Sequence, residues 1–466
     1  MSLPGAKPVP KPGKWKPGGR SIEKKSLVSL FGIGVFVWAF DFKAAASGKA
    51  AAFQAVMLGA YLLSYLRITL AAEDRGIRLG SLWALILATA AFVIGGSVVG
   101  LTEGQVPYEI LVNVIPPFMY VSASLMTYIT LRASGDDLPS FLNFARRACL
   151  AFAVIHIAVL IMTRGSLDLT KSRFEVLSGA VIPSLGIAAV ALIQRLTKMD
   201  ILALIFNLMV TLMSVTRTLF VVLAAQIAAV FMALPSAVFR QSAIKGSSLF
   251  ALLAIVVAAV DIGAGTGLIG RWVDRMTVSS RVGFDPTSLT RTAESHFMKE
   301  RFEASTRSML VGNGMAAVTS LSGPDAQRAA SIVGREAVYI HGSGYGHQAY
   351  WSILFIAGVI GGAGLLIIQF LNGLQAIALL RRIQLIAPGT TGINEHIGAW
   401  GAIIVIGIVA FGFWAGTLGD RATCLWYGIG TGMLYWGREV IQAPKPAPKF
   451  LAHKNRQVII KPPGTG

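Results

Sequence analysis

Residues 345–370 read YGHQAYWSILFIAGVIGGAGLLIIQF. A histidine among glycines ends a long polar stretch here, and an apolar run begins directly after it. That run contains roughly 20 residues, which is the length a helix needs to cross the hydrocarbon core of a bilayer. The polar stretch occupies 263–349 and separates two strongly apolar parts of the chain. The sequence therefore predicts membrane helices interrupted by one large loop, whose last residues lie at the membrane surface.

The overall composition also indicates a membrane protein. Apolar residues make up 54% of the sequence, charged residues only 14%, and the mean hydropathy is +0.65. These values differ strongly from those of soluble globular proteins, so we expect an all-α polytopic membrane protein. We predict about twelve transmembrane helices. They lie at 26–42, 51–72, 81–101, 108–131, 148–163, 177–195, 199–215, 218–235, 247–262, 350–370, 397–414 and 420–437.

The arginines and lysines orient these predicted helices. Many fall in connections on one side, whereas the turns at 102–107 and 415–419 on the other side hold none. By the positive-inside rule, both termini are cytoplasmic and the large loop is outside. Much of the net charge of +19 lies in Pro/Gly-rich tails, for which we expect contact with anionic lipid and not nucleic acid. The predicted parts are a basic tail at 1–25, helices one to nine within 26–262, the partly helical loop at 263–349, helices ten to twelve within 350–437, and a basic disordered tail at 438–466.

Several cations break the positive-inside trend. The smaller outer turn at 164–176 carries Lys171 and Arg173, and Arg217 lies at the outer end of two predicted helices. The large loop carries eight arginines. So many cations on the side where they are disfavoured indicate an anionic ligand at the outer face.

Arg217 lies between two apolar runs, at 199–215 and 218–235. A charged side chain near the bilayer centre costs about 2.5–3.5 kcal/mol on insertion scales. Such a residue usually faces a cavity or a partner, which favours a functional role. The alternative is an arginine at a helix end that extends to the lipid headgroups.

Arg291 and Arg301 fall on a helix predicted within 289–310, which Gly312-Asn313-Gly314 ends. Their spacing leaves them roughly 80° apart around the helix, so we expect them to share one ligand. The arginine fork matches the oxygens of a phosphate. The alternative is that they pair with Glu294, Glu300 or Glu303 on the solvated helix. Lys171 and Arg173 are similar candidates in the smaller outer turn.

His347 is the candidate general base. It follows three glycines at the junction of loop and membrane. Histidine titrates near neutrality and is the side chain most often used to accept a proton in catalysis. The alternative is an interfacial histidine that only forms hydrogen bonds, and His341 is a weaker rival for the role of base.

Metal-binding and transport motifs are scarce in the sequence. No Asp-x-Asp or His-Glu-x-x-His occurs, so we expect neither a metal nor another cofactor. A proton-coupled transporter normally carries carboxylates in the middle of the membrane, and here Asp41 and Asp261 lie only at the ends of predicted spans. A transporter or flippase nevertheless stays open as an alternative.

The order of these residues resembles the O-antigen ligase and polysaccharide polymerase superfamily of bacterial membrane glycosyltransferases. In that family a late loop ends in a histidine before a glycine-containing span, as at 347–361, although Gln348 stands where the family often has asparagine. Thr216-Arg217-Thr218 resembles a Ser-Arg that opens a span. Arg291 precedes Gly312-Asn313-Gly314 at the family's distance, and Arg173 precedes a glycine-containing span that lacks the usual Asn-Pro.

The resemblance implies a GT-C-like enzyme of the bacterial inner membrane with a periplasmic loop. The donor would be an undecaprenyl-diphosphate-linked glycan, and the transfer would need no metal. The acceptor would be another glycan in a polymerase, which we favour, or lipid A core in a ligase. A flippase and a chain-length regulator would be partners. The implied catalytic residues are His347, Arg217 and Arg291, and the implied diphosphate-binding residues are Arg173, Lys171 and Arg301.

Overall fold

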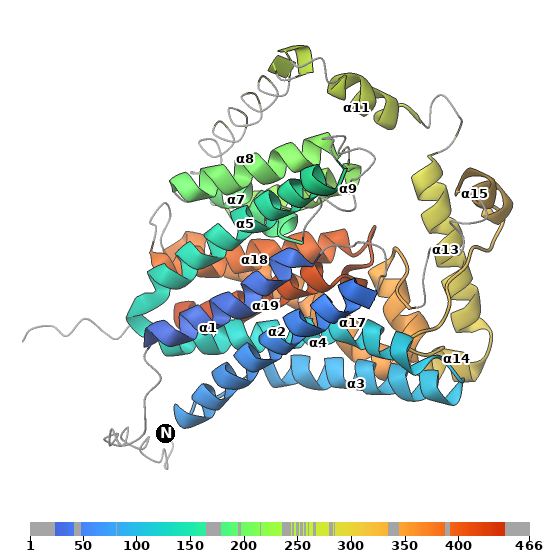
Figure 1. Cartoon of the computed structure of the whole chain (residues 1–466), viewed down its shortest axis with the longest axis horizontal. Helices are drawn as coiled ribbons and strands as arrows, with labels where there is room; N and C mark the ends of the chain where they lie inside the picture. The colour runs from blue at the N-terminus through green and yellow to red at the C-terminus, as the bar shows by residue number, and fades with distance from the viewer. Residues whose placement is uncertain are drawn as a thin grey trace, which may run out of the picture.

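The computed structural model describes most of the chain between residues 24 and 442. The described residues are 24–41, 48–80, 82–164, 179–193, 197–214, 216–234, 244, 247, 251, 255, 258–259, 261–263, 267–278, 283, 285–333, 344–386 and 392–442. Within these ranges all regular secondary structure is helical (Figure 1). The predicted tails lie almost wholly outside the described residues, as does most of the helix predicted at 247–262.

The described elements are α- and 3₁₀-helices. They are α1 (Lys24–Phe36), η1 (Val37–Phe40), α2 (Gly48–Asp74), α3 (Leu82–Thr102), α4 (Pro107–Ser134), η2 (Gly135–Asp137), α5 (Leu138–Arg164), α7 (Val181–Ala191), α8 (Lys198–Met213), α9 (Arg217–Ala233), α11 (Leu268–Met276), α13 (Pro286–Glu303), α14 (Thr306–Val311), α15 (Ala326–Val333), α17 (Ala349–Ile386), α18 (Ile393–Phe411), η3 (Thr417–Gly419) and α19 (Arg421–Gln442).

Six helical segments among the described residues are long and apolar enough to cross a membrane. They are Ala52–Asp74, Leu82–Thr102, Pro107–Ser134, Leu138–Val159, Ala349–Gln384 and Ile393–Phe411. The expectation of an all-helical, membrane-embedded protein agrees with this finding. The count of twelve spans and the sidedness of the loop stay predictions, since shorter apolar helices such as Val181–Ala191 fall below the length of a full span.

Two predicted helix boundaries differ from the structure. The fifth span was expected to begin at 148, but α5 begins at Leu138 and includes Arg146. Arg146 lies 2.6 Å from Asp200, and both side chains are almost fully buried. A charge ends an apolar run in the sequence, but it does not end a helix when a partner neutralises it. The helix predicted at 350–370 also continues to Ile386, through the uncharged residues 371–380.

The centre of the molecule is formed by α4, α18 and α19, whose interior faces are buried. Glycines let α19 lie directly on α4. A Cβ on Gly428 would overlap the carbonyl oxygen of Tyr120, and one on Gly432 would lie 2.6 Å from that of Ser124. Close approach of backbones through small residues is typical of helix packing in membranes.

The helix α17 is broken where it meets the large loop. Gly358 has φ +62°, ψ −166°, a conformation that only glycine adopts without strain. The break frees the carbonyls of Phe355 and Ile356, which accept hydrogen bonds from the backbone N–H groups of Asn313 (2.9 Å) and Gly314 (3.0 Å). The loop is therefore fastened to the N-terminal turns of α17.

The large loop is partly helical, as expected, with α11, α13, α14 and α15 inside it. The single helix predicted within 289–310 is two helices, because Ser305 starts a new one by accepting a hydrogen bond from the backbone N–H of Ser308 (3.0 Å). Figure 1 shows α13 and α14 beside one end of α17, and α15 packs against α13 through Ala329. This arrangement brings the start of α13 and the segment around His347 to the same end of the helix bundle as the start of α9.

Candidate functional site

A cavity of about 1130 Å³ lies where α7, α9, α11, α13 and the end of α18 meet. Its lining joins residues that are far apart in the sequence. Among the described residues it contains three arginines, Arg217, Arg275 and Arg291, and two aspartates, Asp285 and Asp420. The excess of arginines over aspartates favours an anionic ligand in this cavity.

Arg217 is the first residue of α9 and reaches across to the start of α13. Its guanidinium donates a hydrogen bond to a carboxylate oxygen of Asp285 at 2.5 Å and another to the carbonyl of Arg275 at 3.3 Å. Its side chain is half-buried. The arginine that the sequence placed beside the membrane therefore has a partner and lines a cavity.

Asp285 holds this contact in place because it also caps α13. It accepts hydrogen bonds from the backbone N–H of Thr287 and from the hydroxyl of Ser288, each at 3.1 Å. Burial by itself would raise the pKa of Asp285, but the hydrogen bond and charge of Arg217 outweigh burial and hold that pKa below its usual range. The group is thus a carboxylate at neutral pH.

Arg275 adds a second guanidinium beside Arg217. It donates a hydrogen bond to the hydroxyl oxygen of Thr287 at 2.9 Å. Burial and the charge of Arg217 lower the pKa of Arg275, although Asp285 acts in the opposite direction. Two arginines that repel each other in a partly buried cavity would be relieved by a further negative charge, which a bound anion supplies.

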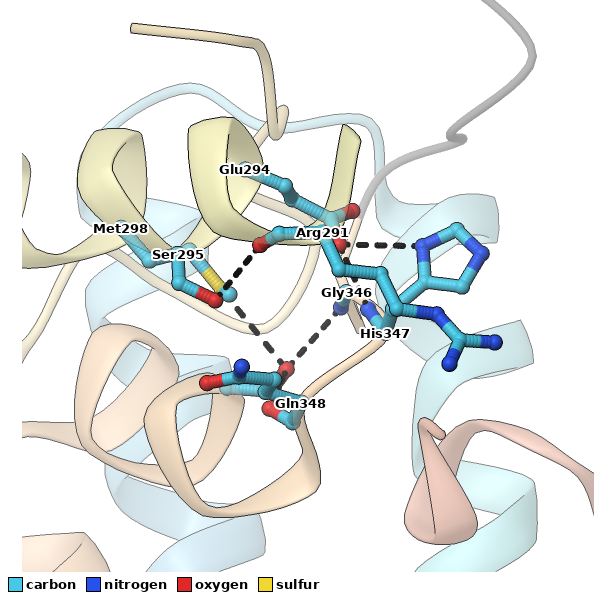
Figure 2. Close-up of polar contacts among 8 residues, drawn as sticks. Arg291, Glu294, Ser295, Met298, Gly346, His347 and Gln348 are labelled. Atoms are coloured by element: carbon cyan, nitrogen blue, oxygen red, sulfur yellow. Dashed lines mark hydrogen bonds and ion pairs between the residues drawn. The ribbon is translucent and has the colours of Figure 1, made fainter. Parts of the chain in front are cut away.

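His347 lies on the lining and is held by Glu294 of α13 (Figure 2). Its backbone N–H donates to Oε2 of Glu294 at 2.8 Å, and its Nδ1 lies 3.0 Å from the same oxygen. The Glu294 side chain is 1% exposed, whereas that of His347 is 35% exposed. The imidazole is thus fixed on one edge and open to the cavity on the other.

Arg291 lies one helical turn before Glu294 on α13. Figure 2 shows its side chain extending past the backbone of His347, so that guanidinium and imidazole lie on the same side of the helix. The carbonyl oxygen of Arg291 accepts a hydrogen bond from the side-chain hydroxyl of Ser295 at 2.8 Å. The helix α13 therefore supplies both a cation and the partner of the histidine.

Another part of the lining is apolar. Trp272 of α11 packs edge-on against Phe220 of α9 at 5.1 Å and donates its indole N–H to the carbonyl of Leu212 at 2.9 Å. Ile269 and Val273 continue this wall from α11, and both are well exposed. The cavity thus combines an arginine-rich end with an apolar wall, as a site for an amphiphile does.

Three residues expected from the sequence, Arg217, Arg291 and His347, line this cavity. Arg301 does not. It lies ten residues beyond Arg291, which is about 15 Å along a helix, and it stacks over Phe297 at 5.6 Å. Contrary to expectation, Arg291 and Arg301 therefore do not meet one ligand in this cavity, because the rise of the helix separates them although the angle between them is small.

Lys171 and Arg173 lie within 165–178, outside the described residues. Two further residues were not singled out from the sequence. Glu294 was considered only as a partner for an arginine, although its place one turn after Arg291 was a usable signal. Asp285 precedes a proline that begins a helix, which is a recognisable cap, but nothing in the sequence pairs it with Arg217.

In the part of the chain that the structure describes, no cluster of three or more His, Cys, Asp or Glu side chains could hold a metal ion. No protein-family model matches this sequence, and no curated protein matches it. The chemistry of the cavity therefore has to be inferred from its own residues.

Proposed function

We propose that this protein is a membrane glycosyltransferase that moves an oligosaccharide from a polyprenyl diphosphate to a glycan acceptor. One observation supports this most strongly: Arg217, Arg291 and His347, which are far apart in the sequence, line one cavity. The cavity also has an apolar wall around Trp272. These are the parts needed for a lipid-linked anionic donor and a proton acceptor.

The donor would bind with its diphosphate at the arginine-rich end. Guanidinium groups of Arg217, Arg275 and Arg291 can each present two N–H donors to phosphate oxygens. The first isoprenoid units would lie along the apolar wall formed by Trp272 and Phe220. This division of the cavity explains why α11, which carries Trp272, is apolar on one side and basic on the other.

The reaction would be a displacement at the anomeric carbon of the donor sugar. The acceptor hydroxyl oxygen forms a new bond to that carbon, and the bond between the carbon and the diphosphate oxygen breaks. The electron pair leaves with the diphosphate, whose growing charge the arginines stabilise. The hydroxyl proton passes to Nε2 of His347.

The choice of acceptor is inferred from the family resemblance. The face of the membrane at which the reaction occurs is inferred from that resemblance and from the distribution of basic residues. We favour polymerisation of lipid-linked repeat units at the periplasmic face of the inner membrane. Transfer to lipid A core is the second candidate, and a lipid-linked glycan transporter is the third, because arginines that bind a diphosphate would serve each of them.

The test is incubation of the purified protein with a polyprenyl-diphosphate oligosaccharide, with and without lipid A core, followed by sizing of the products. A ladder of longer lipid-linked chains without lipid A core supports the polymerase. Product that requires lipid A core supports the ligase. No covalent product from an authentic donor in either reaction would overturn the proposal and leave transport of the donor across proteoliposomes as the next measurement.

A further inference from the structure

The carboxylate of Glu294 is unusual because it is buried within the large loop. Carboxylates are rarely buried without donors that compensate for lost hydration. Two donors come from one residue, since the backbone N–H and the imidazole of His347 both meet Oε2 at 2.8 and 3.0 Å. A partner needed only to neutralise charge would not have to contact both the backbone and the ring of the same residue.

We infer that Glu294 is the positioning residue of His347 and fixes the imidazole in the tautomer that can accept a proton from the acceptor. This inference rests on the proposed function only for the identity of that acceptor. We assign Glu294 as a carboxylate, which can only accept hydrogen bonds, so that its Oε2 accepts both the backbone N–H and a ring hydrogen carried on Nδ1. Nε2 then presents its lone pair, and Figure 2 shows it on the side of the ring turned away from Glu294.

The backbone around His347 leaves room for Glu294 and holds the turn in place. A Cβ on Gly346 would lie 3.0 Å from the carboxyl group of Glu294, so a larger residue would push the carboxylate away. The N–H of Gly346 donates to the hydroxyl of Ser352 at 2.9 Å, and that hydroxyl lies 2.9 Å from the carbonyl of Gln348. The turn that carries His347 is thus held by α13 on one side and by α17 on the other.

The pairing with Glu294 also stabilises His347 after its imidazole has accepted the proton. When Nε2 takes the hydroxyl proton from the acceptor, the ring becomes an imidazolium and donates from Nδ1 to a carboxylate. A charge-assisted hydrogen bond is stronger than the neutral one before it, so Glu294 stabilises the protonated state. The proton later leaves Nε2 to water, and Glu294 itself exchanges none.

The tautomer can be measured without any substrate. Protein labelled with ¹⁵N-histidine, placed in nanodiscs, gives signals for His347 that are identified by their loss in His347→Gln. We expect the wild type to hold hydrogen on Nδ1, and Glu294→Ala to shift His347 towards the form with hydrogen on Nε2. The control is Glu300→Ala, an exposed glutamate of the same helix, whose spectrum should match the wild type.

Kinetics supply the second readout. We expect Glu294→Ala to lower kcat about 100-fold, in the range general-base catalysis contributes, with KM for the donor within about twofold of the wild type. Glu294→Gln, which keeps the shape and an acceptor oxygen, should lose about tenfold and serves if the alanine variant does not fold. Glu300→Ala should keep wild-type kcat.

The outcomes separate this inference from the proposed function. A tautomer that moves in Glu294→Ala, with no transfer activity even in the wild type, supports the inference and overturns the function. Transfer activity in the wild type, with an unmoved tautomer and a kcat of Glu294→Ala within twofold, overturns the inference and leaves the function standing.

Discussion

The guanidinium of Arg217 lies 2.5 Å from the carboxylate of Asp285, and this contact joins the start of α9 to the start of α13. Both helix starts belong to the lining of the cavity. The first residue of α9 is thereby tied to the helix that carries Arg291 and Glu294. This ion pair therefore contributes, with the hydrogen bond from Arg275 to Thr287, to the position of α13 relative to the other walls of the cavity.

Asp285 has two roles that two substitutions separate. Asp285→Asn removes the charge but keeps a good helix cap, whereas Asp285→Ala removes both. We expect the alanine variant to be less stable than the asparagine variant by about 1 kcal/mol, the usual contribution of a cap. Thermal unfolding of the three purified proteins in one detergent measures the difference. Equal midpoints for the two variants would show that the cap contributes nothing.

The ion pair also predicts a pH dependence of stability. The pKa of Asp285 is lower in the folded protein than its usual value of about 3.9. A lowered folded pKa means that the stabilisation is complete above about pH 5 and is lost as the pH falls below 4 through the folded value. The difference in unfolding midpoint between wild type and Asp285→Asn should therefore be constant from pH 5 to 8 and shrink below pH 4. A difference that grows on acidification would contradict this assignment.

The sequence predicted the helical membrane class because that class depends on apolar length and charge placement, both of which are local. It could not predict where α5 begins, because Arg146 is accommodated by Asp200 from α8, which is distant in the sequence. The same limit applies at the site. Arg217 and His347 stood out by their position beside apolar runs, but Glu294 gains its role only when α13 packs beside the segment before α17.

The buried pair of Arg146 and Asp200 gives a stability prediction far from the cavity. Their side chains are 7% and 2% exposed and 2.6 Å apart, and Arg146 also contacts Nε2 of His396 at 3.1 Å. Removal of one partner leaves an uncompensated buried charge, so Asp200→Asn should destabilise the protein by about 3–5 kcal/mol. The double variant Arg146→Met, Asp200→Asn should recover part of that loss. Denaturation in a mild detergent compares the three proteins, and an unchanged midpoint in Asp200→Asn would contradict the prediction.

The break in α17 predicts that replacement of Gly358 destabilises the protein. An alanine at Gly358 would have to adopt φ +62°, at a cost of about 1–3 kcal/mol, and its Cβ would overlap the carbonyl of Leu310. We expect Gly358→Ala to lower the yield of folded protein and its unfolding midpoint. Gly59→Ala is the matched control, because that glycine lies within a regular helix with no atom near its added Cβ. It should keep the wild-type midpoint.

The last prediction concerns the arginines of α13, where sequence and structure differ. Arg291 lines the cavity, whereas Arg301 stacks over Phe297 about 15 Å further along the helix. If the arginines stabilise the leaving diphosphate, Arg291→Ala should lower kcat/KM about 100- to 1,000-fold, the usual effect of one preorganised donor at a developing charge. Arg301→Ala removes the same charge from the same helix and should stay within about threefold of the wild type. Initial rates with a polyprenyl-diphosphate oligosaccharide make the comparison, with Arg291→Lys included because a lysine keeps the charge but loses the paired N–H donors. Equal losses in the two alanine variants would mean that the overall charge of the loop, and not the cavity, carries the effect.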